Sequence, residues 1–338
     1  MTPALPRRRF LAAGASALAL AACARPAPPP ERGPIAAMFP GSIDDGGFIE
    51  AGYRGLLRVQ DELRIPVRYV DRVPPDAEAM KAALRELAES DATMVIAFGG
   101  QAAEAVQRVA WEIPGQRFTS IQGSLTRPNL AVYEVLQEQS AWLAGAAAGL
   151  LTRSNVVGHM SGLRVRPGLK GRAAFAAGLA NTNPRAKLLT SFSGTQDDAA
   201  VAKRIALAQI DAGADLLFTM LNAGRAGAIE ACRERGVKQI GNVRDWVAVL
   251  PEVFVASAVA DGGVAVVQSV RDLHDRIWKG DLVKRIGIRD RDAVRLALAP
   301  APVVPPAVQA RIAVLTQEMT AGAIKIPDDY TGPEFAPA

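Results

Sequence analysis

The chemically most suggestive stretch of this 338-residue sequence is Asp44-Asp45-Gly46-Gly47-Phe48, which follows an apolar run and precedes an amphipathic helical pattern. Carboxylates accept hydrogen bonds from hydroxyl and ring N–H groups, and an aromatic ring offers a flat apolar face. Glycines let the backbone approach a bound molecule closely. The stretch is therefore a candidate ligand-binding loop. The alternative is that Asp45 or a neighbour only caps the helix, as aspartate often does before an apolar-periodic segment.

Residue patterns typical of enzymes are largely missing. His159 lies in an apparent buried strand and His274 in a helical segment, and neither has partners at metal-ligand spacing. The sequence contains neither a Gly-x-Ser-x-Gly elbow nor a Gly-x-x-x-x-Gly-Lys-Ser/Thr phosphate loop. The carboxylate pairs at residues 44–45 and 197–198 could act as a glycosidase-like acid and base, but adjacent carboxylates on a loop usually point apart. We therefore expect no enzymatic activity, no cofactor and no metal site.

The elements that must position such a loop are visible in the hydrophobic pattern. From Pro34 onward, short apolar runs alternate with amphipathic helical segments. We expect strands at residues 34–39, 67–70, 92–99, 117–123, 130–136, 155–162, 186–194, 215–222 and 238–243. We expect helices at residues 48–63, 76–90, 101–113, around 172–182, 200–213, 224–236, 267–278 and 307–322. Two such series predict two doubly wound α/β lobes, with a ligand between the carboxyl ends of their strands.

The amino-terminal segment predicts export and anchoring. A basic head at residues 7–9 precedes an apolar, Ala-rich stretch that ends in small residues, which is typical of a secretory signal over residues 1–22. Cys23 follows Leu-Ala-Ala and resembles the lipid-modified cysteine of a bacterial lipobox; an ordinary signal with a stray cysteine is the alternative. Paired arginines before Phe-Leu also resemble a twin-arginine signal. Residues 23–33 are Pro-rich and predict an extended tether.

We therefore expect a protein that is lipid-anchored to the cell membrane on its periplasmic or extracellular face. The three signal arginines account for part of the formal net charge of +5, so charge does not predict a polyanion binder. An exported lipoprotein also cannot act on cytoplasmic DNA, and we expect no nucleic-acid partner. Cys232 lies at a helical position and is expected to be a small buried residue.

Six segments, taken in order, resemble the basic membrane protein family of ABC-transporter substrate-binding lipoproteins, which includes the purine nucleoside receptor. They are residues 44–56, 138–162, 175–184, 193–218, 222–232 and 238–246. The first has the family's pattern of paired aspartates, a spacer, a phenylalanine and a later Gly-Leu. The second resembles the family's crossover helix, in which an acidic residue precedes an aromatic-Leu-Ala-Gly sequence. Each segment is weakly specific by itself, and the shared order makes the resemblance strong.

The resemblance implies a type I periplasmic-binding-protein fold, whose two lobes are joined by crossover strands and close over a ligand. It implies an ABC permease as partner. We expect a first lobe of residues 34–137 plus 252–285 and a second lobe of residues 138–251 plus 286–330. The candidate ligand-binding residues are Asp44, Asp45, Phe48, Gly100, Gln101, Gln196, Asn222, Asn242, Arg244, Asp245 and Trp246.

Four positions depart from the family pattern and bear on the ligand. Ile49 replaces an Asn, Gln196 a frequent aromatic, Val243 an Asp that would hold ribose hydroxyls, and Ala260 a Lys. Trp246 could supply the lost stacking face. We expect a small polar heterocycle, which could be a purine nucleoside, a nucleobase or a related compound, and we expect a base to bind more tightly than a nucleoside. The alternatives are a sensor subunit of the same fold without transport and, ranked below it, a nucleoside-processing hydrolase.

Overall fold

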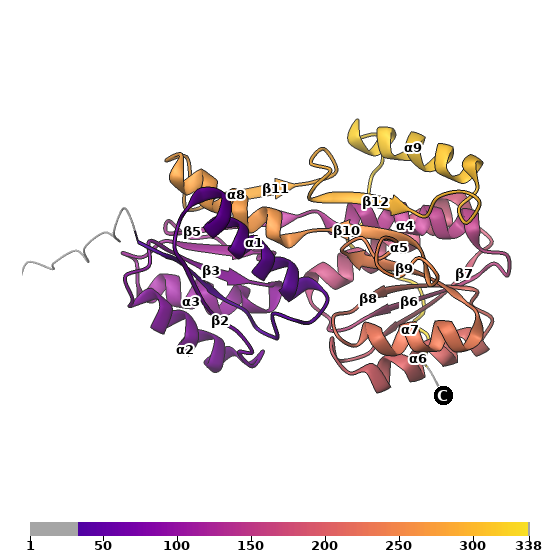
Figure 1. Cartoon of the computed structure of the whole chain (residues 1–338), viewed down its shortest axis with the longest axis horizontal. Coiled ribbons are helices and arrows are strands. Elements are labelled where there is room, and N and C mark those ends of the chain that lie inside the picture. Colours follow the sequence, from indigo (N-terminus) through magenta and orange to yellow (C-terminus); the bar gives the residue numbers. More distant parts are fainter. Residues whose placement is uncertain (1–32, 337–338) are drawn as a thin grey trace, which may run out of the picture.

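Two six-stranded sheets lie side by side along the long axis of the molecule and form the cores of two lobes (Figure 1). The computed structural model describes residues 33–336. The predicted signal, the predicted lipidation site Cys23 and the predicted tether up to residue 32 lie outside these residues. The strands are β1 (Ile35–Met38), β2 (Val67–Val70), β3 (Met94–Phe98), β4 (Phe118–Ile121), β5 (Leu130–Val135), β6 (Val156–Ser161), β7 (Lys187–Phe192), β8 (Leu216–Met220), β9 (Lys238–Val243), β10 (Phe254–Ala260), β11 (Val283–Ile286) and β12 (Val294–Leu298). The helices are α1 (Phe48–Leu63), α2 (Ala77–Ala88), α3 (Ala103–Glu112), α4 (Gln137–Leu151), α5 (Arg166–Thr182), α6 (Ala199–Asp211), α7 (Arg225–Arg235), α8 (Gly262–His274) and α9 (Pro306–Thr320), with a 3-10 turn η1 (Gly100–Ala102).

The first lobe is built on a parallel sheet with the strand order β11-β5-β4-β3-β1-β2. Successive side chains of a strand point to opposite faces. In β1, Ile35 and Ala37 pack with the residues of α1 and α8, whereas Ala36 and Met38 pack with those of α2 and α3. Because both faces are covered by helices, the inner strands β1 and β3 read as continuous apolar runs.

The second lobe has the strand order β12-β10-β9-β8-β6-β7, in which β12 alone runs antiparallel to its neighbour. Helices α4 and α5 cover one face of this sheet, and α6 and α7 cover the other. The pair α4 and α5 packs at very short distance, because Gly145 faces the carbonyl of Phe175 and Gly178 faces the carbonyl of Trp142. A Cβ at either glycine would overlap these carbonyls. This close packing holds α5 in place, and the first residue of α5, Arg166, pairs with Glu134 of the first lobe.

The position of β10 differs from the predicted lobe boundary at residue 252. The prediction places residues 252–285 in the first lobe, but β10 pairs with β9 and β12 in the second sheet. The chain returns to the first lobe at α8, which packs against α1. The physical reason is that a strand buried on both faces has the same pattern in either sheet, so its partners are chosen by contacts far away in the sequence. The chain thus crosses between the lobes after β5, after β10 and between β11 and β12.

The elements form largely where the pattern predicts them. The helix at 48–63 and the strands at 67–70 and 238–243 have the predicted bounds. Helix α5 begins six residues before the predicted 172, and Pro167 lies in its first turn, where its missing N–H has no intrahelical partner to lose. The pattern does not predict strands β10, β11 and β12. The fold class, two doubly wound α/β lobes joined by crossover segments, is confirmed.

The carboxyl-terminal residues of the described chain lie on the second lobe. The N–H of Phe335 donates to the carbonyl of Thr190 in the edge strand β7 at 2.7 Å. Glu334 pairs with Arg164 at 2.5 Å and with Arg172 at 2.5 Å. These contacts tie the tail to the loop that leads into α5.

Candidate ligand-binding site

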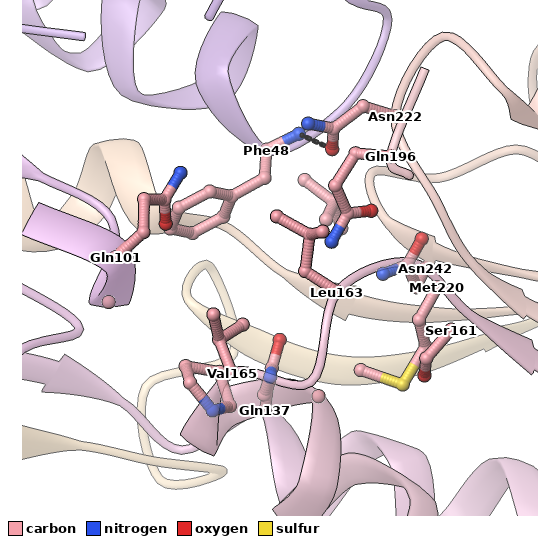
Figure 2. A pocket seen from close by; sticks show the side chains of 14 residues that line it. Phe48, Gln101, Gln137, Ser161, Leu163, Val165, Gln196, Met220, Asn222 and Asn242 are labelled. Carbon is pink, nitrogen blue, oxygen red and sulfur yellow. Dashed lines mark hydrogen bonds between the residues drawn. The ribbon is translucent and has the colours of Figure 1, made fainter. Parts of the chain in front are cut away.

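A cavity lies between the two lobes, at the carboxyl ends of strands from both sheets (Figure 2). Its volume is about 70 Å³, which holds on the order of five waters. Ligand sites of doubly wound sheets form at this edge, because the loops that follow parallel strands converge there. The lining residues are Phe48, Gly100, Gln101, Gln137, Ser161, Leu163, Val165, Pro167, Gly168, Gln196, Met220, Asn222, Asn242 and Val243.

Side-chain amides dominate the polar part of this wall. The amides belong to Gln101, Gln137, Gln196, Asn222 and Asn242, and they are joined by the hydroxyl of Ser161. Among the described residues that line the cavity, none carries a charge. A carboxamide offers donors and an acceptor, whereas a buried charge needs a counter-charge that this wall does not supply. The cavity therefore suits an uncharged molecule with polar edges.

The loop before α1 joins the two lobes at one side of the cavity. The backbone N–H of Phe48 donates to Oδ1 of Asn222 in the second lobe at 3.1 Å (Figure 2). The Phe48 ring lines the cavity, and the ring of Phe98 packs behind it with a centroid distance of 4.5 Å. Gly47 lies so close to Asn222 that an added Cβ would be 2.8 Å from Oδ1. The two lobes are thus in direct contact here.

Asp45 caps α1 and does not line the cavity. Its Oδ1 accepts from the N–H groups of Gly47 at 2.7 Å and Glu50 at 3.0 Å, and its Oδ2 accepts from Ile49 at 3.1 Å. Burial raises the pKa of Asp45, and the three N–H groups oppose this shift. Both oxygens therefore satisfy the start of a helix, which is the alternative that the sequence left open. Asp44 is also outside the cavity, because its side chain is 75% exposed and pairs with Arg72.

Three further predicted residues follow β9 but lie behind or beside the cavity. Trp246 is buried, and its Nε1 donates to the carbonyl of Asn242 at 3.1 Å, so its ring supports β9 and supplies no stacking face in the cavity. Arg244 and Asp245 line a second hollow of about 230 Å³ against α1. In that hollow Arg244 lies 3.9 Å from Glu50 of the first lobe.

Strand ends explain which residues the sequence identified and which it missed. Of the predicted residues, Phe48, Gly100, Gln101, Gln196, Asn222 and Asn242 line the cavity. The missed polar residues are Gln137, just after β5, and Ser161, the last residue of β6. The same rule that selected Gln101 would have found both. The missed residues Leu163, Val165, Pro167 and Gly168 precede or begin α5, and no pattern in the sequence indicates that this segment reaches the first lobe.

Ser161 belongs to a hydrogen-bonded series that ends at a buried histidine. Its Oγ lies 3.2 Å from Nε2 of His159, and Nδ1 of that ring lies 2.8 Å from Oγ1 of Thr190. Burial lowers the pKa of His159 to about 3, so the ring is neutral and a very weak base at neutral pH. The group that orients the ring is a hydroxyl and not a carboxylate. This series orients the Ser161 hydroxyl in the cavity without the features that activate a nucleophile.

The four departures from the family pattern have different surroundings. Ile49 is 1% exposed and packs in the core of the first lobe. Gln196 and Val243 line the cavity, and Val243 has φ +70°, which is unusual for a β-branched residue. Ala260 is buried at the end of β10 and does not line the cavity. Only two of the four therefore bear directly on the cavity wall.

Charged residues at the first crossover link the lobes beside the cavity. Glu134 on β5 accepts from Lys170 at 3.0 Å and from Arg166 at 3.2 Å, both on α5, and Lys170 also lies 2.5 Å from Glu138. Burial favours a raised pKa for Glu134, but the hydrogen bond and charge of Lys170 hold that pKa below its ordinary value. Glu134 is therefore a charged contact between a strand of the first lobe and a helix of the second.

Two features are absent from the described part of the chain. Between residues 33 and 336, none of the helices combines the length and the apolar character needed to cross a bilayer. In the same part of the chain, no group of three or more His, Cys, Asp or Glu residues is arranged to hold a metal ion.

A family model described as ABC transporter substrate-binding protein PnrA-like matches residues 34–329. The transcriptional activator protein med of Bacillus subtilis is 22% identical over 62% of this chain and 65% of its own length. An uncharacterized lipoprotein of Pyrococcus abyssi is 23% identical over 75% of this chain and 68% of its own. A purine-binding protein of Brucella abortus is 19% identical over 64% of this chain and 61% of its own. The chain thus spans about two thirds of the length of these relatives.

Solved structures of similar fold cover nearly the whole described chain. An ABC transporter solute-binding protein from Aeropyrum pernix has a TM-score of 0.77 and 19% identity, and the match covers 88% of this chain and 94% of that one. A solute-binding protein from Conexibacter woesei has a TM-score of 0.69 and 23% identity, with coverage of 88% and 99%. These likenesses confirm the type I periplasmic-binding-protein fold.

Proposed function

Because this chain belongs to the PnrA-like family of ABC transporter substrate-binding proteins, we propose that its interlobe cavity binds an uncharged ring compound, a nucleobase or a closely related heterocycle. The ligand is held between the lobes and released to an ABC permease. The observation that carries this proposal is the cavity wall of five carboxamides and a hydroxyl without a charged side chain.

The uncharged wall argues against charged solutes. A carboxylate, a phosphate or an ammonium group would be buried without a partner, which costs several kcal/mol even after relaxation. A neutral heterocycle instead offers donors and acceptors in its plane, which carboxamides can match. Its flat faces fit the side of the cavity formed by Phe48, where Phe98 holds the ring in place.

A changed residue in the cavity wall favours a base over a nucleoside. Val243 stands where the family resemblance implies an Asp that holds ribose hydroxyls, and the structure places this valine in the cavity wall. The relative from Brucella abortus is named a purine-binding protein, which supports a ligand of this class.

The anchoring of the protein is part of this proposal. We propose that Cys23 carries the lipid and that a tether connects it to β1, so that the lobes work outside the cell membrane. The lipoprotein relative from Pyrococcus abyssi supports this arrangement. Cys23→Ser should abolish fatty-acid labelling and release the protein from the membrane fraction. Equal labelling of the variant and the natural protein would contradict the proposal.

Ligand sensing without transport is a second candidate function. It is favoured by the relative from Bacillus subtilis, which is named a transcriptional activator and matches 62% of this chain. Both functions use the same cavity. Genes for a permease and an ATPase beside the gene of this chain would favour transport.

The test is a thermal-shift screen of the mature protein with matched pairs of compounds. Hypoxanthine and inosine differ by a ribose, and uracil and orotate differ by a carboxylate. A ligand that binds the folded state raises stability by about 2.7 kcal/mol at a concentration of 100 Kd. We expect stabilisation by at least one uncharged base, a smaller effect of its nucleoside and none of orotate. Stabilisation by charged compounds alone would refute the proposal, and recovery of a chemically altered ligand would favour the hydrolase.

A further inference from the structure

A buried arginine stands directly behind one of the amides of the cavity. Arg225, the first residue of α7, is 1% exposed, and its Nη2 donates to Oδ1 of Asn242 and to the carbonyl of Leu221. The guanidinium lies 4.5 Å from the centre of the Trp246 ring. The Nε1 of this tryptophan donates to the backbone carbonyl of Asn242. Arg225 and Trp246 therefore hold Asn242 by its side chain and by its backbone.

The contact with Arg225 decides which end of the Asn242 amide faces the ligand. A guanidinium can only donate hydrogen bonds, so its partner must be the amide oxygen. The Nδ2 group then points the other way. Figure 2 shows the nitrogen of Asn242 on the cavity side of the amide and the oxygen on the far side. Rotation of the amide would bring an N–H group against the guanidinium and would leave the oxygen without its donor.

We propose that Arg225 is a positioning residue that fixes Asn242 as a hydrogen-bond donor to the ligand. The ligand must then present an acceptor at this place, which is a carbonyl oxygen or an unprotonated ring nitrogen. An amino group or a ring N–H would meet another N–H and would be disfavoured. The chemical class of the ligand rests on the proposed function, but the contact between Arg225 and Asn242 can be tested in the empty protein.

The surroundings of Arg225 leave part of its guanidinium without partners, so the stability of the protein should respond to a change at Asn242. Within residues 33–336, Nε and Nη1 of Arg225 have no hydrogen-bond partner, and both hydrogen bonds of Nη2 go to uncharged oxygens. Burial lowers the pKa of Arg225 to about 9, and the charge of Asp45 opposes this shift, so the side chain is still a cation at neutral pH. A buried cation without a paired anion gains stability when an anion is placed at its side.

The experiment changes Asn242 in two ways that differ only in polarity. Asn242→Asp keeps the acceptor for Arg225, adds a negative charge beside it and removes the Nδ2 donor. We expect the melting temperature of the empty mature protein to stay the same or to rise by about 2–4 °C. Asn242→Leu has a similar size but removes the acceptor, and we expect its melting temperature to fall. If both variants melt equally early, Arg225 does not bind Oδ1 and the inference is wrong.

A second background removes the cation. In Arg225→Met, the change Asn242→Asp buries a carboxylate without a partner, and we expect it to lower the melting temperature. A rise in both backgrounds would show that the stabilisation does not come from Arg225. If Arg225→Met does not fold, the comparison of Asn242→Asp with Asn242→Leu still decides the inference.

Binding completes the test, with hypoxanthine as the probe that carries a carbonyl acceptor. We expect Asn242→Asp to weaken its binding about ten- to a hundredfold although the protein is as stable as before. Unchanged affinity in this variant would overturn the assignment of Asn242 as a donor. If hypoxanthine and uracil both fail to bind the natural protein, the proposed ligand class is wrong. The melting temperatures of the Asn242 variants still test the contact with Arg225 in that case.

Discussion

Replacement of Gly47 by alanine should weaken ligand binding by preventing complete closure of the lobes. An added Cβ would lie 2.8 Å from Oδ1 and 3.0 Å from Cα of Asn222. Gly47 belongs to the first lobe and Asn222 to the second, so this overlap exists only when the lobes are in contact. Because one of the two atoms is backbone, a change of rotamer cannot remove the overlap, and the lobes must move apart.

The expected loss of affinity in Gly47→Ala follows from the contacts that are lost. Moving the lobes apart breaks the hydrogen bond from Phe48 N–H to Asn222, which is 3.1 Å long and worth about 1 kcal/mol. Accommodating an added methyl group in a packed contact costs about 1–3 kcal/mol. The closing free energy should fall by about 2–4 kcal/mol in total, which weakens binding by roughly thirtyfold or more. The cores of the lobes are untouched, so the empty protein should melt at nearly the same temperature.

A double-mutant cycle separates this overlap from effects of the added methyl group within the loop of Gly47 itself. The assay is calorimetry, with the base that gives the largest thermal shift, on Gly47→Ala, Asn222→Ala and the double variant. If the overlap is the cause, Gly47→Ala costs less affinity once the side chain of Asn222 is truncated. An equal cost in both backgrounds would refute the reasoning.

Three further predictions test other parts of the site. Asp45→Ala removes the acceptor of three N–H groups at the start of α1 and should lower the free energy of unfolding by about 1–2 kcal/mol with unchanged ligand affinity; a large loss of affinity at constant stability would contradict the capping role. The lowered pKa of Glu134 implies a stabilising contact with Lys170 that is complete above the ordinary pKa of 4.5 and is lost as the pH falls below it. Thermal melts should therefore show a steeper acid loss for the natural protein than for Glu134→Gln, and parallel curves would count against this link. Val243→Asp places a carboxylate in the cavity wall, at a backbone conformation that Asp tolerates better than Val. Titration should show that inosine gains affinity relative to hypoxanthine. An unchanged ratio of the two affinities would show that Val243 does not select against the sugar.

The fold could be predicted because its main signals are local. The apolar strands and amphipathic helices of each lobe are continuous segments, and helix 48–63 appears with the predicted bounds. What could not be predicted is the sheet that a buried strand joins. Strand β10 is absent from the predicted strands, its apolar residues suit either lobe, and its membership in the second sheet depends on pairing with β9 and β12. Pairing between strands that are far apart in the sequence cannot be recognised from the residues of one strand alone.

The site was predictable to the extent that strand ends define it. Gln101, Asn222 and Asn242 follow or end strands and line the cavity. Chemical type alone misled in two cases, because a carboxylate can cap a helix and an indole can support a strand, as Asp45 and Trp246 do. Arg225 could not be recognised, because an arginine in the first turn of a helix is usually exposed, and its burial depends on the packing of Trp246 against it.

The three crossings of the chain between the lobes also determine the order in which the protein can mature during synthesis. The first sheet lacks β11 until residue 286 has been made, and β10 in the second sheet lacks β12 until residue 298. Until then β5 and β10 each present an unpaired edge, which is a template for association with other chains. Neither sheet has its full set of strands until at least 286 of the 338 residues have been made. Chaperones and proteases therefore act on nearly full-length chains, and a chain that ends early leaves both sheets open at once.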